Sequence, residues 1–144
     1  MKKKHFINII FPAIFSIILS ACVTSASSSG LTGSAWKLLS YGPASQQIQA
    51  LSDIDTLVAF NPDGLISGSL GCNSFGGKYR AAGGQISFSE MTQTMMACET
   101  RVLDQESAVM QIFSSNTRFT LQSGILTITS EDGDSVVIFY AEQK

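Results

Sequence analysis

Short turn signals divide most of this chain into segments that are long enough for strands and too short for helices. They lie at residues 62–64, 81–84, 123–124 and 131–134. Proline presets one backbone dihedral and glycine tolerates a positive φ, so these sequences favour tight turns. Strands separated by such turns at a spacing of about 8–12 residues predict a sandwich or a barrel. The predicted strands are residues 34–41, 55–61, 65–70, 75–80, 85–88, 117–122, 125–129 and 135–141.

One segment departs from this strand pattern. Residues 99–115 contain no glycine or proline, and their apolar side chains recur at intervals of three and four, at Val102, Leu103, Val109, Met110 and Phe113. That period is typical of an amphipathic helix. Acidic side chains in its first half, Glu106 included, suit the positive end of the helix dipole. We therefore expect a mainly β chain with one helix, an α+β fold in which the helix packs on a small antiparallel sheet or barrel.

Two local expectations follow from the same patterns. In residues 34–41 the alternation places Trp36 and Leu38 on one face of the strand, and Leu39 and Tyr41 on the other. Residues 46–52 are polar and show neither period, so they are interpreted as a loop.

The N-terminal residues have the features of a bacterial lipoprotein signal. A basic start precedes an apolar run over residues 6–19, which is shorter than the roughly 20 residues of a membrane-spanning helix. Leu19, Ser20 and Ala21 lead to Cys22 and resemble a lipobox, which implies a signal peptide at residues 1–21 and lipidation of Cys22. Several acyl chains at Cys22 would anchor the protein stably to a membrane. Ordinary secretion with cleavage near Ala26 is the alternative.

The residues after the predicted signal form a small, polar segment. Residues 22–30 lack the apolar content needed to bury a core, and they are interpreted as a lipidated flexible tether. Val23 stands where an aspartate would favour retention in the inner membrane. The sequence therefore predicts an outer-membrane lipoprotein that faces the periplasm.

Charge and composition exclude several classes of function. The chain has 9 Lys and Arg against 11 Asp and Glu, and without the three lysines of the signal six basic residues remain, for a formal net charge of −5. Such a balance argues against a nucleic-acid partner, since phosphate contacts need clustered basic residues. The single histidine is His5, inside the signal. Catalytic triads and His-ligated metals are therefore not expected, and we predict no enzyme activity, no metal and no cofactor.

Cys72 and Cys98 are interpreted as a disulfide. They lie 26 positions apart, so they do not form a Cys-x-x-Cys redox or zinc motif. In an oxidising compartment two cysteines usually pair, and lipidation of Cys22 leaves an even number. Free buried thiols are the main alternative and a catalytic thiol the least favoured one. A bond that closes this loop would stabilise the fold by roughly 3–4 kcal/mol.

Neighbouring residues suggest two further kinds of site, and both are less favoured. Met91, Met95 and Met96 precede Cys98, and soft sulfur ligands suit Cu(I). Methionines that fill gaps in the core are the preferred interpretation. The glycine-rich residues 68–77 lack the spacing of a phosphate-binding loop, so these glycines are expected to permit turns or bulges. Asn73 is expected to bond to its own local backbone.

Taken in order, these segments resemble the META domain, also called HslJ-like, over residues 31–142. The resemblance rests on Phe60 with Asp63-Gly64, on the glycine-cysteine-asparagine run at residues 68–79, and on the Thr-x-Met-Ala-Cys run at residues 94–98. Met95 stands where a basic residue is common, and Glu99 where proline is common. The resemblance implies that the signature residues determine the fold instead of forming a site: Trp36, Gly71, Cys72, Asn73, Phe75, Ala97 and Cys98.

The resemblance also frames the expected function. It implies a small β-rich domain of the bacterial envelope, related to envelope or heat stress, with no enzymatic activity attached to it. We expect a binding module for another envelope protein, with membrane contact through the anchor at Cys22. One alternative is a binder of a small apolar molecule in a groove between sheet and helix. The other is an inhibitor of a secreted hydrolase that inserts a turn such as residues 61–64 or 81–84.

Overall fold

The computed structural model describes residues 30–114 and 116–142. The predicted signal, Cys22 and the predicted tether up to residue 29 lie outside the described residues. The predicted domain at residues 31–142 lies within this range, apart from residue 115. Within the described residues, no helix is both long enough and apolar enough to cross a membrane.

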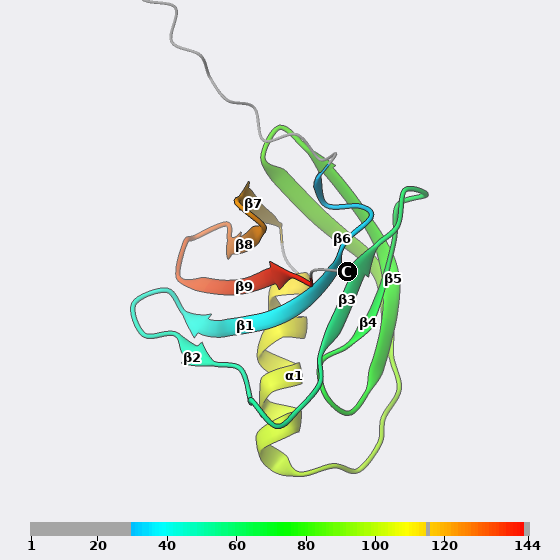
Figure 1. Ribbon diagram of the computed structural model, residues 1–144, viewed down its shortest axis with the longest axis vertical. Coiled ribbons are helices and arrows are strands. Elements are labelled where there is room, and N and C mark those ends of the chain that lie inside the picture. Colours follow the sequence, from blue (N-terminus) through cyan, green and yellow to red (C-terminus); the bar gives the residue numbers. More distant parts are fainter. Residues whose placement is uncertain (1–29, 115, 143–144) are drawn as a thin grey trace, which may run out of the picture.

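The described residues form an antiparallel barrel, as the mainly β prediction required. Neighbouring strands follow the order β2-β1-β3-β4-β5-β6-β7-β8-β9, and β1 also pairs with β9, which closes the sheet. β1 pairs with β3 near its start and with the short strand β2 near its end. β2 therefore adds no separate position to the wall, which consists of the other eight strands (Figure 1). The strands are β1 (Ala35–Pro43), β2 (Ile48–Gln49), β3 (Leu57–Phe60), β4 (Leu65–Ser69), β5 (Ser74–Ala82), β6 (Gln85–Gln93), β7 (Thr117–Gln122), β8 (Ile125–Ser130) and β9 (Ser135–Ala141).

The helix α1 (Thr100–Phe113) packs against the barrel and links two of its weakly paired strands. β6 and β7 are joined by only two residue pairs, Gln85 with Arg118 and Ile86 with Thr117. α1 connects these two strands in the sequence and packs against β1, β6, β8 and β9. Phe113, at the end of α1, is fully buried and contacts the rings of Phe75, Phe88 and Phe139. The core therefore occupies the barrel interior and extends under the helix.

The strand predictions fail where a bulge breaks the alternation. β1 has a register shift between Leu38 and Ser40, which makes Leu39 the extra residue. Tyr41 is therefore buried, whereas Leu39 is exposed, so the prediction that these two side chains share a face was wrong. A two-residue strand, β2, also lies in the segment that was interpreted as a loop.

β6 is longer than its sequence predicts. It extends to Gln93, five residues past the predicted end, with a second register shift opposite Gly76 and Lys78 of β5. Glu90 adopts a φ of 53°, which ordinary strand residues avoid. The local twist removes the alternation of apolar and polar side chains on which the prediction relied. The extension matters for the site, because it carries the chain to the loop before α1.

Candidate functional site

The predicted pairing of Cys72 with Cys98 is confirmed. The disulfide joins the connection between β4 and β5 to the segment just before α1, with 6.4 Å between the two α-carbons. It holds the loop of residues 94–99 against the barrel at the end where β6 finishes. These two cysteines are therefore structural, and we name residues 94–99 the disulfide-held loop.

Gly71 makes the approach to the disulfide possible. Its φ is 140°, a region that other residues rarely adopt. A Cβ at this position would lie 2.6 Å from Ile54 Cγ2 and 2.7 Å from Val102 Cγ1. The backbone before Cys72 thus passes close to α1, and a larger residue would clash with the side chains of Ile54 and Val102.

Asn73 connects three segments, whereas the sequence suggested that its side chain would bond to its own local backbone. Its Nδ2 donates to Glu106 Oε2 at 2.8 Å, and its backbone N–H donates to Glu106 Oε1 at 2.6 Å. Its Oδ1 accepts from the Thr94 hydroxyl at 3.0 Å and from the Met96 backbone N–H at 2.8 Å. Asn73 is itself buried. One amide side chain therefore ties β5, the disulfide-held loop and α1 together.

Glu106 is the residue that sequence reasoning assigned wrongly. It is 3% exposed, lies on the buried face of α1, and accepts from the backbone N–H groups of Cys72 and Asn73. It is not in the first turn of the helix, so the dipole does not explain it. Its signal in the sequence was an acid within the apolar stripe of Val102, Val109 and Phe113. A charged side chain on such a face indicates a buried acceptor that needs donors.

Gln105 completes this polar contact and was also missed. It is fully buried, its Nε2 donates to Leu70 O at 2.8 Å, and its Oε1 accepts from the Leu51 N–H at 2.9 Å. No buried side-chain nitrogen or oxygen in the described part of the chain lacks a hydrogen-bond partner. The polar groups under α1 are thus fully paired, which is the condition under which they stabilise a fold.

The disulfide-held loop exposes two methionines. Met95 is 95% exposed and Met96 is 55% exposed, so the interpretation of these residues as core filler was wrong. Met91 fits that interpretation, because it packs against the core and its sulfur lies over Gly77. The loop backbone is held by Asn73, and by Thr94, whose N–H donates to Ser74 O at 3.0 Å. Large apolar side chains are therefore displayed on a fixed backbone.

The remaining signature residues serve the fold in different degrees. Trp36 is buried and its Nε1 donates to Leu31 O at 2.9 Å. Phe75 is buried, with its ring centroid 5.8 Å from that of Phe113. Ala97 is exposed, so burial does not explain it. Among the described residues, no three His, Cys, Asp or Glu side chains are grouped to hold a metal ion.

The predicted groove between sheet and helix is filled. The hollow among Leu70, Phe75, Glu106 and Met110 leaves no room for a water molecule. A larger hollow of about 830 Å³ lies between the end of α1 and the turn that joins β8 to β9, and its lining mixes Ile112 and Pro43 with Glu131 and Asp132. Neither has the enclosed apolar lining that holds a small apolar molecule.

An ion pair at the start of α1 predicts a small acid-sensitive contribution to stability. Arg101 Nη2 lies 2.8 Å from Asp53 Oδ2, and its hydrogen bonds hold the pKa of Asp53 below the usual range. Because the folded pKa is the lower one, this carboxylate stabilises the fold above its unfolded pKa of about 3.9. That stabilisation is lost as the pH falls through the folded pKa. Because both side chains are largely exposed to solvent, this ion pair contributes little to the free energy of unfolding.

In the Arg101→Gln variant, the Asp53 carboxyl should therefore titrate at a higher pH than in the parent. Carbon-detected NMR of the carboxyl signal measures the midpoint directly. Lys78→Gln removes a cation that pairs with Glu90 instead, so it should leave the Asp53 midpoint unchanged. An unchanged midpoint in Arg101→Gln would contradict the assigned cause.

Comparison with known proteins identifies the fold. A family model described as META domain matches residues 29–143. No curated protein matches the chain. An NMR structure of a protein from Burkholderia xenovorans is similar over 100% of both chains, with a TM-score of 0.69 and 19% sequence identity. A crystal structure of a DUF4847 family protein from Bacteroides vulgatus has a TM-score of 0.57 and 12% identity, covering 81% of this chain and 98% of that one. At these identities the solved structures indicate a shared fold alone.

Proposed function

The chain belongs to the META domain family, and on that premise we propose that it is a non-enzymatic binding module of the bacterial envelope. Its partner would be another envelope protein. The lipobox-like Leu19 to Cys22 supports an acyl anchor at Cys22, and Val23 supports the periplasmic face of the outer membrane. A link to envelope or heat stress stays a prediction of the family resemblance.

The observation that carries this proposal is the display of Met95 and Met96. Isolated exposed apolar residues are ordinary, but here two adjacent methionines stand on a backbone held by a disulfide and by Asn73. A held backbone lowers the entropy lost on binding. Unbranched, polarisable methionine side chains adapt to partner surfaces of different shape. Together these features suit a protein-binding loop.

The position of this loop fits an anchored protein. Gly30, where the described chain begins, lies against Leu121 of β7. In Figure 1 the first coloured segment of the chain runs near the turn between β5 and β6. The disulfide-held loop lies at the opposite end of the barrel, below β5 in Figure 1. With an anchor at Cys22, the end that carries Gly30 would face the membrane, and Met95 would face away from it toward a periplasmic partner.

The residues of the family signature support a non-catalytic role. Cys72 and Cys98 are joined to each other, so neither offers a thiolate nucleophile. Glu106 is enclosed by donors from Cys72 and Asn73 and has no access to a substrate. The most distinctive residues of the chain are thus used in holding the loop.

Photo-crosslinking from the loop tests the proposal. A photoreactive amino acid at position 95 of the full-length chain should give one discrete adduct with an envelope protein in cells of the native host. The same amino acid at the exposed position Thr120, on β7, serves as the matched control and should give none. Met96→Asp should weaken the adduct at position 95 without changing stability by more than about 0.5 kcal/mol, because the side chain is exposed.

The outcome also separates the alternatives. Equal adducts at positions 95 and 120, or none at either, would contradict a binding site at the loop. The photoreactive amino acid is also placed in the turns at positions 61–64 and 81–84. An adduct with a secreted hydrolase there, and none at position 95, would favour the inhibitor. An adduct with a small molecule would favour the ligand binder.

A further inference from the structure

Two arginines stand apart from the other cations of the described chain. Lys37 pairs with Asp55 and Glu142, Lys78 pairs with Glu90, and Arg101 pairs with Asp53 and Glu99. Arg80 and Arg118 form no ion pair within residues 30–114 and 116–142. In a domain with a net negative charge, cations without carboxylate partners are available to an external anion.

The strand register brings these two arginines to one surface. Arg80 on β5 lies opposite Ser87 on β6, and Arg118 on β7 lies opposite Gln85 on β6. Gln85 and Ser87 are two residues apart, so their side chains share the outer face of β6. From ordinary strand spacing and rise, the α-carbons of Arg80 and Arg118 are roughly 12 Å apart. Two long cationic side chains therefore flank one stretch of β6.

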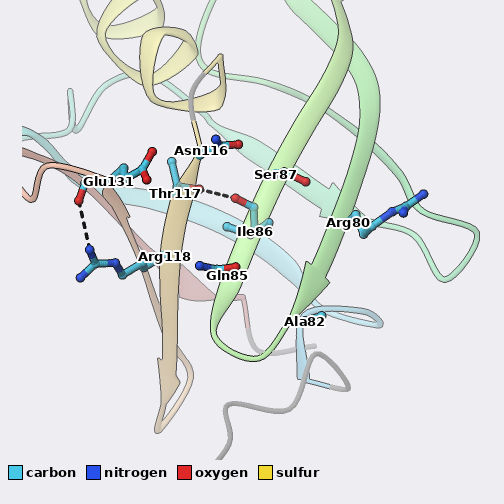
Figure 2. Close-up of a pocket in the computed structure, with 9 residues that line it drawn as sticks. All are labelled: Arg80, Ala82, Gln85, Ile86, Ser87, Asn116, Thr117, Arg118 and Glu131. Atoms are coloured by element: carbon cyan, nitrogen blue, oxygen red, sulfur yellow. Dashed lines mark hydrogen bonds between the residues drawn. The ribbon is translucent and has the colours of Figure 1, made fainter.

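A polar hollow of about 360 Å³ lies between them, lined by Arg80, Arg118, Gln85, Ser87 and Asn116 among others. Figure 2 shows the two arginines on either side of Gln85 and Ser87, with their guanidinium groups extending outward, so both side chains would turn inward to hold a ligand over β6. Arg118 is oriented by a hydrogen bond from Nη2 to the Glu131 backbone oxygen at 3.2 Å. The Thr117 hydroxyl is bound to Ile86 O and faces inward, so it is not available to a ligand.

We propose that this hollow binds an anionic oxygen group, a phosphate or a carboxylate, between Arg80 and Arg118. Guanidinium groups bind such oxygens with charge-assisted hydrogen bonds, and the amides of Gln85 and Asn116 supply neutral donors. Glu131 lies at the rim, and its carboxylate opposes the anion. This unfavourable charge keeps the binding weak. Removing it should therefore strengthen binding, whereas removing either arginine should weaken it.

The place of the site suggests the source of the anion. It lies on β5, β6 and β7 near the end of the barrel that carries Gly30, which would face the membrane if Cys22 is acylated. A phospholipid headgroup then presents its phosphate to Arg80 and Arg118 and orients the domain on the bilayer. This part of the inference rests on the proposed anchor, whereas the anion site itself does not.

The experiment follows the backbone amide NMR signals of the full-length chain in neutral-detergent micelles. One arm adds inorganic phosphate, and the other adds phosphatidylglycerol to the micelles at a low mole fraction. We expect saturable shifts of signals from residues 85–87 and 116–118. Arg80→Gln and Arg118→Gln should each weaken binding about fivefold to tenfold, and the double variant should abolish it.

Two further variants make the test specific. Glu131→Gln should strengthen binding about twofold to threefold, because it removes a like charge from the rim. Arg101→Gln changes the net charge by the same amount as the arginine variants, but at the far end of the barrel, so it should change nothing.

Arginine-dependent shifts with inorganic phosphate support a site for free anions, and shifts with phosphatidylglycerol alone support a headgroup site. The inference is overturned if neither arm gives saturable shifts, or if the double variant keeps them. Such a failure leaves the crosslinking result at position 95 untouched, so the two proposals are judged separately.

Discussion

Replacing both Cys72 and Cys98 by alanine is expected to lower the free energy of unfolding by about 3.5 kcal/mol. The bond joins positions separated by 26 residues, and closing a loop of that length removes this much conformational freedom from the unfolded chain on the entropy model. The total stability of a domain this size is about 5–15 kcal/mol, so the loss is a large share. Urea unfolding of the parent and of the double variant at the same pH measures the difference.

Three comparisons make this result informative. The parent protein in reducing buffer should unfold at the same urea concentration as the double variant, because both lack the cross-link. The slope of the free energy against urea should rise in both, since an unfolded chain without the cross-link exposes more surface. A difference below about 1 kcal/mol would mean that Asn73 and Glu106 hold the loop without the disulfide.

Loss of the disulfide should also affect the proposed binding surface. The loop would keep the hydrogen bonds from Thr94 and Met96 to Asn73, but its end at Cys98 would be released. Amide hydrogen exchange of Met96 should therefore accelerate more than exchange in β8, at the far side of the barrel. A weaker adduct from position 95 in the same variant would connect the held backbone to binding.

The parts of the fold that follow from local rules were predictable. β7 and β9 begin and end where the sequence placed them, because their boundaries are set by adjacent turn residues such as Gly124 and Gly133, both at positive φ. The two bulges were not predictable, because an extra residue at Leu39 or a positive φ at Glu90 depends on the partner strand. Closure of the sheet through β1 and β9 is a contact between distant residues and leaves no local signal.

The candidate site divides in the same way. The cysteine pair could be predicted, because the number and spacing of the cysteines are read from the sequence, and the expected oxidising compartment favours pairing. The roles of Asn73 and Glu106 could not, since their bonds span 33 positions and depend on how α1 docks on the barrel. The exposure of Met95 was also hidden, because an apolar residue in a loop has no periodic neighbours from which its face can be read.

The contact between Asn73 and Glu106 gives the second large effect. Asn73→Asp keeps the shape of the side chain and the acceptor that Thr94 and Met96 use, but places a second carboxylate oxygen against Glu106 Oε2. We expect a loss of about 3–5 kcal/mol at neutral pH, because two like charges would be buried together. The difference in the free energy of unfolding between variant and parent should close on acidification. One of the two carboxyls is then protonated, and its O–H donates a hydrogen bond to the other. Urea unfolding at pH 7 and pH 4 measures both values.

Exchanging the two groups should restore the stability that each single variant loses. Glu106→Gln alone should cost about 2–3 kcal/mol, because either orientation of the new amide turns an N–H toward a donor of Cys72 or Asn73. In the double variant the amide oxygen at position 106 accepts from both backbone N–H groups. Its NH₂ then donates to the carboxylate at position 73, so every group is paired again.

A double-mutant cycle measures this exchange as a coupling energy. If Asn73 and Glu106 act through their mutual hydrogen bond, the double variant should be at least about 2 kcal/mol more stable than the sum of the single losses predicts. Additive losses would mean that each residue acts through other neighbours, namely Thr94 and Met96 for Asn73, and the backbone of Cys72 for Glu106. Asn73 would then hold the disulfide-held loop to β5 without joining it to α1, and the stable display of Met95 would depend on the disulfide and on the bonds from Thr94 and Met96 to Asn73.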